Sequence, residues 1–271
     1  MDFVCPKCKR QLLAPDGKVK RCSMGHSFDR AKEGYFNLLL GASSGTHGDN
    51  ADMVRARRDF LSLGYYYPMA KRVSELVLLN TKSGGGVLDF GLGEGYYTDI
   101  IESSLAERDG DSCVLGFDIS KDAVKLAAKR NKRLNLAVAS SYDIPIADSS
   151  VDTAVNIFSP LAISEVLRVL KPQGVFIMVY PDTDHLFGLK SAIYKAPYKN
   201  KPEDTHIEGF EILSGESLRY TVTLDSNAAI RSLFMMTPYA YRTGMEERER
   251  VLSLQTLTTE VQFCINVYKK L

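Results

Sequence analysis

The stretch VLDFGLGEGYYT, residues 87–98, carries the signals of a strand, a tight loop and the start of a helix. Its apolar run ends at Asp89, and glycines follow at alternate positions: Gly91, Gly93 and Gly95. Glycine lets the backbone approach a ligand closely, and the free N–H groups at a helix start attract an anion. The stretch therefore predicts a ligand-binding loop between a buried strand and a helix.

The spacing G-x-G-x-G separates this loop from two other nucleotide-binding loops. It differs from the G-x-G-x-x-G of dinucleotide-binding folds and from the G-x-x-x-x-G-K-[ST] of a P-loop. An acid at the strand end, Asp89, suits a ligand that has an ammonium group. The pattern favours S-adenosylmethionine (SAM) as the ligand; the alternative is a glycine-rich turn with a purely structural role.

Strands and helices alternate on both sides of this loop, which predicts an α/β fold with a parallel sheet and helices on both faces. The second strand ends at Asp118, where a nucleotide-binding sheet holds ribose hydroxyls. Near the C-terminus we expect a helix over 227–236 and a final antiparallel hairpin. The expected core strands lie at 112–117, 134–139, 152–157, 175–180 and 258–269, and the helices at 51–63, 69–79, 98–105, 121–131 and 163–170.

The N-terminus has the spacing of a metal site: Cys5 and Cys8 form a C-x-x-C pair, and Cys22 and His26 follow thirteen residues later. Three thiolates and an imidazole can enclose one tetrahedral Zn²⁺. A redox pair is the alternative, but no thioredoxin-like βαβ pattern surrounds it. All four positions are filled by protein, so the zinc is structural, and it orders a segment that has few large apolar residues.

Charge and composition narrow the class of protein. The whole chain has a formal net charge of +1, whereas its first 35 residues hold eight Lys and Arg against four Asp and Glu. This local excess suits a nucleic-acid contact, or simply a solvated surface. The helix over 51–63 carries three more cations, Arg55, Arg57 and Arg58. They suit either contacts to phosphate groups or a solvated helix face. We expect no membrane span and no signal peptide, and five cysteines indicate a reducing, cytoplasmic setting.

We expect three parts along the chain. Residues 1–36 form a basic zinc-binding module, the Gly/Ser-rich segment within 37–50 forms a flexible linker, and residues 51–271 form the ligand-binding α/β domain.

Five motifs between residues 86 and 180 resemble class I SAM-dependent methyltransferases. They are Asp89 with the glycines, Asp118, Ile144-Pro145, Val151-Asp152 and the LKPQG ending at Gly174. The resemblance implies a Rossmann-like, mostly parallel seven-stranded sheet beside the zinc module.

Nearly the whole chain resembles the bacterial 23S ribosomal RNA (guanine-N1-)-methyltransferases, which include housekeeping and macrolide-resistance members. The similarity lies in CPxC at 5–8, GHxFD at 25–29, AKEGYxNLL at 31–39, DMVxARRxFL at 52–61, GYY at 64–66, GEGYYT at 93–98 and His185-Leu186. It implies a 23S rRNA substrate, a homodimer, and cofactor contacts from Tyr66, Tyr97, Thr98 and His185. Read without the resemblance, Tyr66 is a core aromatic and His185 a surface loop residue.

The expected reaction is attack of guanine N1 on the methyl group of SAM. The N1 proton needs an acceptor, and the candidates are Asp182, Asp184 and the turn at 156–160. N1 lies on the Watson–Crick edge, so the base must be unpaired, and Phe158 suits stacking on it. The alternatives are a methyltransferase for a small molecule or protein with zinc only as a brace, and a non-enzymatic RNA binder that uses SAM as an effector.

Overall fold

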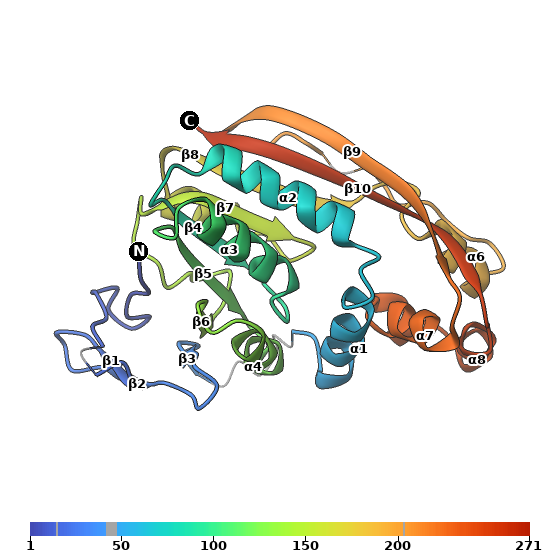
Figure 1. The fold of residues 1–271 in the computed structure, drawn as a ribbon, viewed down its shortest axis with the longest axis horizontal. Helices are drawn as coiled ribbons and strands as arrows, with labels where there is room; N and C mark the ends of the chain where they lie inside the picture. Colours follow the sequence, from blue (N-terminus) through green and yellow to red (C-terminus); the bar gives the residue numbers. More distant parts are fainter. Residues whose placement is uncertain (15, 42–47, 203) are drawn as a thin grey trace.

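The computed structural model describes residues 1–14, 16–41, 48–202 and 204–271, and its centre is one eight-stranded sheet (Figure 1). Neighbours from β3 to β8 are parallel, and β10 runs antiparallel to both β8 and β9. This confirms the expected α/β fold. In spatial order the strands are β3 (Phe36–Asn37), β6 (Asn135–Val138), β5 (Cys113–Asp118), β4 (Gly86–Phe90), β7 (Val151–Ile157), β8 (Leu170–Pro181), β10 (Leu257–Lys270) and β9 (Phe210–Leu224).

The sheet has one strand more than the seven expected, because the short β3 pairs with β6 at its edge. The sequence around β3 is too short to show a strand period, so pairing with β6 decides its conformation. The predicted boundary between module and linker falls within β3, and Leu38 just beyond it is buried. Residues 42–47 of the predicted linker lie outside the described residues, and the three-part division stays a prediction.

Helices α2 (Tyr67–Asn80), α3 (Tyr96–Arg108) and α4 (Lys121–Arg130) cover one face of the sheet (Figure 1). In α4 the Ser120 side chain accepts a hydrogen bond from the Ala123 amide and caps the helix. The apolar positions Val124 and Ala127 then recur at helical spacing and are buried against the sheet. The packing of this helix on the sheet therefore follows from the helical spacing of its apolar residues.

The N-terminal module packs against the opposite face of the sheet, together with α5 (Ile163–Val169). Phe3 is fully buried in one apolar cluster with Phe90 and Phe117 of the central strands. The Val4 amide donates to the Pro145 carbonyl at 2.8 Å. The module's own hairpin consists of β1 (Val19–Arg21) and β2 (Ser27–Asp29). Its first residues are thus part of the catalytic domain's core.

The remaining helices gather around the carboxyl ends of the parallel strands. α1 (Ala51–Leu61) packs on α7 (Asn227–Met235), which lies in the long connection between β9 and β10 (Figure 1). The same connection holds the short helix η1 (Pro238–Tyr241) and α8 (Met245–Leu252), while α6 (Phe187–Ile193) follows β8. None of the described helices is long and apolar enough to cross a bilayer.

Phe3→Ala tests whether the module and the catalytic domain share one core. Since Phe3 is fully buried, the free energy of unfolding should fall by about 3–5 kcal/mol. Urea denaturation followed by a probe in the catalytic domain measures the change. The control is Leu13→Ala in the same module, where the side chain is exposed and the change should stay within about 0.5 kcal/mol. Equal, small changes in both variants would mean that the module merely adheres to the sheet.

Candidate active site and zinc cluster

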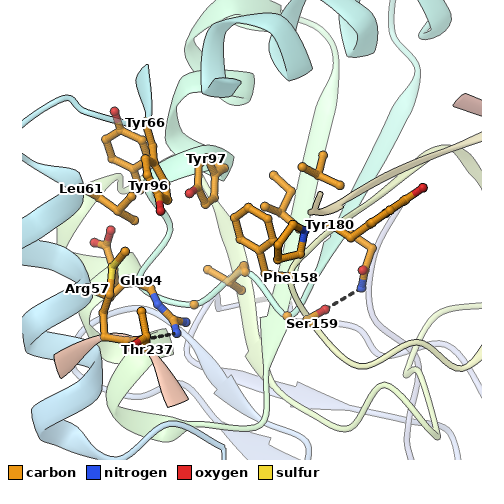
Figure 2. Close-up of a pocket in the computed structure, with 18 of the residues that line it drawn as sticks. Arg57, Leu61, Tyr66, Glu94, Tyr96, Tyr97, Phe158, Ser159, Tyr180 and Thr237 are labelled. Atoms are coloured by element: carbon orange, nitrogen blue, oxygen red, sulfur yellow. Dashed lines mark hydrogen bonds between the residues drawn. The ribbon is translucent and has the colours of Figure 1, made fainter. Parts of the chain in front are cut away.

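A cavity of about 440 Å³ opens at the carboxyl ends of β4, β7 and β8 (Figure 2). Ligands of open parallel sheets bind at this edge. Its walls come from the glycine loop at 91–95, the turn at 156–160, the end of β8, helix α1 and the segment at 236–239. The lining includes six aromatic side chains: Tyr66, Tyr96, Tyr97, Phe158, Tyr180 and Tyr239.

Two glycines of the loop are required for different reasons. Gly91 has φ +76°, and a Cβ there would lie 2.2 Å from the Ser159 side chain, so only glycine fits against the turn at 156–160. Gly93 has φ +59°, and a Cβ there would meet only Arg57 Nη1, at 3.8 Å. Its backbone is therefore open to the cavity, as a cofactor cradle requires, whereas Gly91 serves packing.

Asp89 and Asp118 support the loop from behind the cavity wall. Asp89 is 2% exposed, and its carboxylate accepts a hydrogen bond from Thr98 Oγ1 at 2.6 Å. Asp118 accepts from the amides of Gly93 at 2.9 Å and Ser120 at 2.8 Å. Burial raises the pKa of both carboxyls, that of Asp89 to about 7. Asp118 therefore fixes the loop's backbone and Asp89 fixes the Thr98 side chain, and ionisation of either carboxyl carries an electrostatic cost.

Tyr66 and His185 form a buried polar pair at the cavity. The Gln262 amide donates to His185 Nδ1 at 3.3 Å, so Nε2 holds the proton and donates to the Tyr66 hydroxyl, also 3.3 Å away. Burial and the charge of Lys190 lower the pKa of His185 to about 3. The imidazole is therefore neutral at physiological pH. His185 is not a surface loop residue, and Tyr66 is both a core aromatic against Phe60 and part of the lining.

The nine predicted cofactor residues divide into two groups. The first group lines the cavity: Tyr66, Gly91, Gly93, Tyr97 and His185. The second lies behind it: Asp89, Gly95, Thr98 and Asp118.

Three polar residues of the lining were not predicted from the sequence: Arg57, Glu94 and Thr237. Arg57 was expected only as a contact to phosphate or as part of a solvated face. A charge inside the glycine loop was a usable signal for Glu94. No local pattern marks Thr237, because the connection between β9 and β10 brings it to the cavity.

Phe158 stands at the cavity in a strained conformation. Its φ is +59°, rare for a residue other than glycine, and its side chain is 40% exposed. The turn is held because Ser159 Oγ donates to the Phe90 carbonyl at 3.0 Å and accepts from Asn156 Nδ2 at 2.5 Å. The ring lies edge-to-face with Tyr97, with centroids 6.5 Å apart. The fold thus presents an aromatic face to solvent beside the cavity.

Cys5, Cys8, Cys22 and His26 converge as predicted, with all ligand atoms within 4.8 Å of one another. His26 Nδ1 lies 3.4 Å from Cys5 Sγ, and the sulfurs of Cys8 and Cys22 are 3.6 Å apart. Tetrahedral zinc with Zn–S bonds of about 2.3 Å places its ligand atoms about 3.7 Å apart. The four residues therefore fit a structural zinc ion. Burial raises the pKa of Cys22, but amide hydrogen bonds from Met24 and His26, together with hydrogen bonds from the Cys8 and Cys5 thiols, lower it to about 6.

Similarity to known protein families and to a solved structure agrees with this geometry. The family model described as a methyltransferase domain matches residues 81–226, and the zinc-ribbon model described as RlmA, N-terminal, matches residues 3–40. The solved structure of YcgJ from Bacillus subtilis superposes with a TM-score of 0.51 at 13% identity, over 75% of this chain and 98% of that one. Fold and site together define a class I SAM-dependent methyltransferase with an N-terminal zinc ribbon.

Relatives narrow this class further. The chain is 31% identical to the 23S rRNA (guanine(748)-N(1))-methyltransferase of Streptomyces fradiae, over 96% of this chain and 95% of that protein. It is 33% identical to YxjB of Bacillus subtilis, over 88% of this chain and 86% of that one. The chain belongs to the 23S rRNA (guanine-N1-)-methyltransferase family.

Replacing a zinc ligand should abolish metal binding. Cys8→Ser should reduce the zinc content from about one ion per chain to nearly none, because a structural site needs all four of its ligands. Mass spectrometry of the purified protein measures this content. Cys113→Ser and Cys264→Ser are matched controls, since both thiols lie outside the cluster. Retention of tightly bound zinc by Cys8→Ser would exclude the four-ligand site.

Asp89→Asn should stabilise the ligand-free protein at high pH. The folded state raises the pKa of Asp89 from 3.8 to about 7, so the stability that protonation provides is present below pH 3.8 and lost as the pH rises through 7. The variant avoids this loss. Since one pKa unit corresponds to about 1.4 kcal/mol, its free energy of unfolding at pH 8 should exceed the wild-type value by about 1–3 kcal/mol.

Denaturation at pH 5 and pH 8 measures the effect of Asp89→Asn, which should be larger at pH 8. The exposed Asp111 provides the control, and Asp111→Asn should show no such trend. A variant that loses stability equally at both pH values would show that the hydrogen bond to Thr98, rather than the charge, dominates at this position.

Proposed function

We propose that the protein transfers a methyl group from SAM to N1 of a guanine in a hairpin of 23S rRNA. The observation that supports this most directly is Phe158, a strained, exposed aromatic beside the cofactor cavity. Such a ring suits stacking on an extruded base, and N1 is accessible only in an unpaired guanine. The activity named for the Streptomyces fradiae relative, a 23S rRNA (guanine(748)-N(1))-methyltransferase, agrees with this substrate.

In this proposal the predicted residues hold SAM, whose sulfonium supplies an activated methyl group. Gly91, Gly93 and Gly95 shape the loop, and Tyr97 offers an aromatic face that suits a sulfonium. Asp118 serves the ribose at the end of β5. Tyr66 and His185 form a neutral wall, while Asp89 and Thr98 brace the loop from behind. Most of the rate acceleration then comes from positioning the two reactants.

The structure narrows the search for the proton acceptor. Asp182 accepts hydrogen bonds from Thr183, Ser217 and Gln262, and it does not line the cavity. Asp184 also lies outside the lining and pairs with Lys199 at 2.9 Å. Of the three earlier candidates only the turn at 156–160 reaches the cavity, through Asn156, Phe158 and Ser159. We therefore propose that an oxygen of this turn accepts the hydrogen bond of N1–H and that the proton passes from N1 to solvent water.

The zinc ribbon is proposed to grip the rRNA hairpin. Lys20 is buried and paired with Asp2, so it is not available to RNA. Lys9 is exposed but pairs with Asp143. The other cations of the module are exposed and suit phosphate contacts: Lys7, Arg10, Lys18, Arg21, Arg30 and Lys32. Among the arginines of α1, Arg57 turns toward the cavity, whereas Arg55 and Arg58 pair with neighbouring acids.

We further propose a homodimer that works in the cytoplasm, where ribosomal RNA is available. The outer strand β9 carries exposed apolar side chains, Ile212 and Leu213, which suit contact with a second copy. The three-part division also remains part of the proposal, with residues 1–36 as the RNA-recognition module, a linker within 37–50 and residues 51–271 as the catalytic domain.

The test is methyl transfer from labelled SAM to unmethylated 23S rRNA, mapped by reverse-transcriptase stops. N1 methylation blocks Watson–Crick pairing, so one new stop at a hairpin guanine is expected. Phe158→Ala should lower kcat/KM for the RNA by about tenfold, the size of one lost base stack, with cofactor binding unchanged. No label on rRNA from zinc-loaded protein that binds SAM would refute the proposal and favour a small-molecule or protein substrate.

A further inference from the structure

Glu94 has a buried carboxylate oxygen for which the structure provides no partner. It stands between Gly93 and Gly95, is 2% exposed and lines the cavity. Its Oε2 accepts a hydrogen bond from Arg130 Nε at 3.1 Å. Its Oε1 has no hydrogen-bond partner among the residues that the structure describes, and it is the one buried side-chain atom of that part of the chain in this condition. Leaving a buried acceptor unpaired is costly, and more so when it is charged.

Neighbouring cations leave Glu94 Oε1 without a hydrogen bond. Arg57, which is also in the lining, is engaged elsewhere: its Nη1 lies 2.6 Å from the Asp49 carboxylate, and its Nη2 donates to the Met236 carbonyl at 3.4 Å. Burial raises the pKa of Glu94, and the charge of Arg130 works against this rise. The site is thus prepared for a donor that arrives with a ligand, and a positive charge on that donor would favour the ionised carboxylate.

The position of Glu94 distinguishes between the possible donors. The sulfonium of SAM has no N–H or O–H to donate. The α-ammonium of its methionine part has three, and the α-carboxylate of the same group suits the free amides at the start of α3, directly after Glu94. The target guanine is expected at Phe158, which lies farther across the cavity, beyond Tyr97 (Figure 2).

We propose that the Glu94 carboxylate receives the α-ammonium group of the SAM methionine moiety. The inference rests on the proposed function only in taking SAM as the cofactor. It assigns Glu94 the role of binding the ammonium, which Asp89 does not fill because its carboxylate lies outside the lining and accepts from Thr98 Oγ1. The loop then binds both charges of the amino acid with adjacent residues, the ammonium with Glu94 and the carboxylate with the start of α3.

Calorimetry with the full-length, zinc-loaded protein tests this assignment. S-adenosylhomocysteine keeps the ammonium and lacks the sulfonium charge, whereas 5′-methylthioadenosine lacks the whole amino-acid part. Glu94→Gln keeps an acceptor for Arg130 and removes the charge. It should weaken S-adenosylhomocysteine about 10- to 100-fold, the usual size of one charge-assisted hydrogen bond, and leave methylthioadenosine within about twofold.

Glu102→Gln is the matched control, because Glu102 is a buried acid of α3 that pairs with Arg133 and does not line the cavity. The Glu102→Gln variant should bind S-adenosylhomocysteine and methylthioadenosine as tightly as the wild-type protein does. Should Glu94→Gln fail to fold, Glu94→Asp keeps the charge and withdraws it by one methylene, and it should weaken S-adenosylhomocysteine selectively.

Three outcomes would overturn the assignment. If Glu94→Gln binds both probes more weakly by the same factor, the loop is distorted. If the variant binds SAM more weakly but binds S-adenosylhomocysteine normally, the carboxylate lies at the sulfonium. Unchanged binding of both probes with a loss of rRNA methylation would assign Glu94 to the guanine. An inactive wild-type protein on rRNA would instead refute the proposed substrate and leave the binding comparison valid.

Discussion

The close approach of the glycine loop to the turn at 156–160 is the constraint on which the site depends. Gly91 leaves no room for a Cβ because the Ser159 side chain occupies that space, and Ser159 in turn donates to the carbonyl of Phe90. The loop that is proposed to hold the cofactor and the turn proposed to receive the base are therefore one unit. The strained backbone of Phe158 is tolerated because these neighbours fix it from both sides.

Neutral polar groups make up much of the remaining wall. His185 is kept uncharged by burial and by Lys190, and its two nitrogens are committed to Gln262 and Tyr66. Such a wall gives a cationic ligand aromatic faces and oriented dipoles, and it adds no positive charge to that of Arg57, which is paired with Asp49. The negative charge on the lining is then concentrated at Glu94, among the residues that the structure describes.

The sequence predicts the local parts of this structure better than the distant ones. Strand and helix periods and the spacing of the four zinc ligands are encoded by neighbouring residues, and the structure confirms them. Arg57 and Thr237 reach the cavity because α1 and the connection after β9 fold over the loop. No periodic pattern in the neighbouring sequence predicts such a distant contact. Likewise β3 is a strand only because β6 offers it an edge.

Phe3 gives the metal an influence far from its ligands. The side chain is fully buried in the apolar cluster of the catalytic sheet, two residues before Cys5. Free energy released when the ribbon closes on zinc is thereby linked to folding of the enzyme, as for any ligand that binds only the native state. A cell short of zinc would lose this methyltransferase through unfolding and proteolysis, so ribosome modification would follow the metal supply without any dedicated sensor.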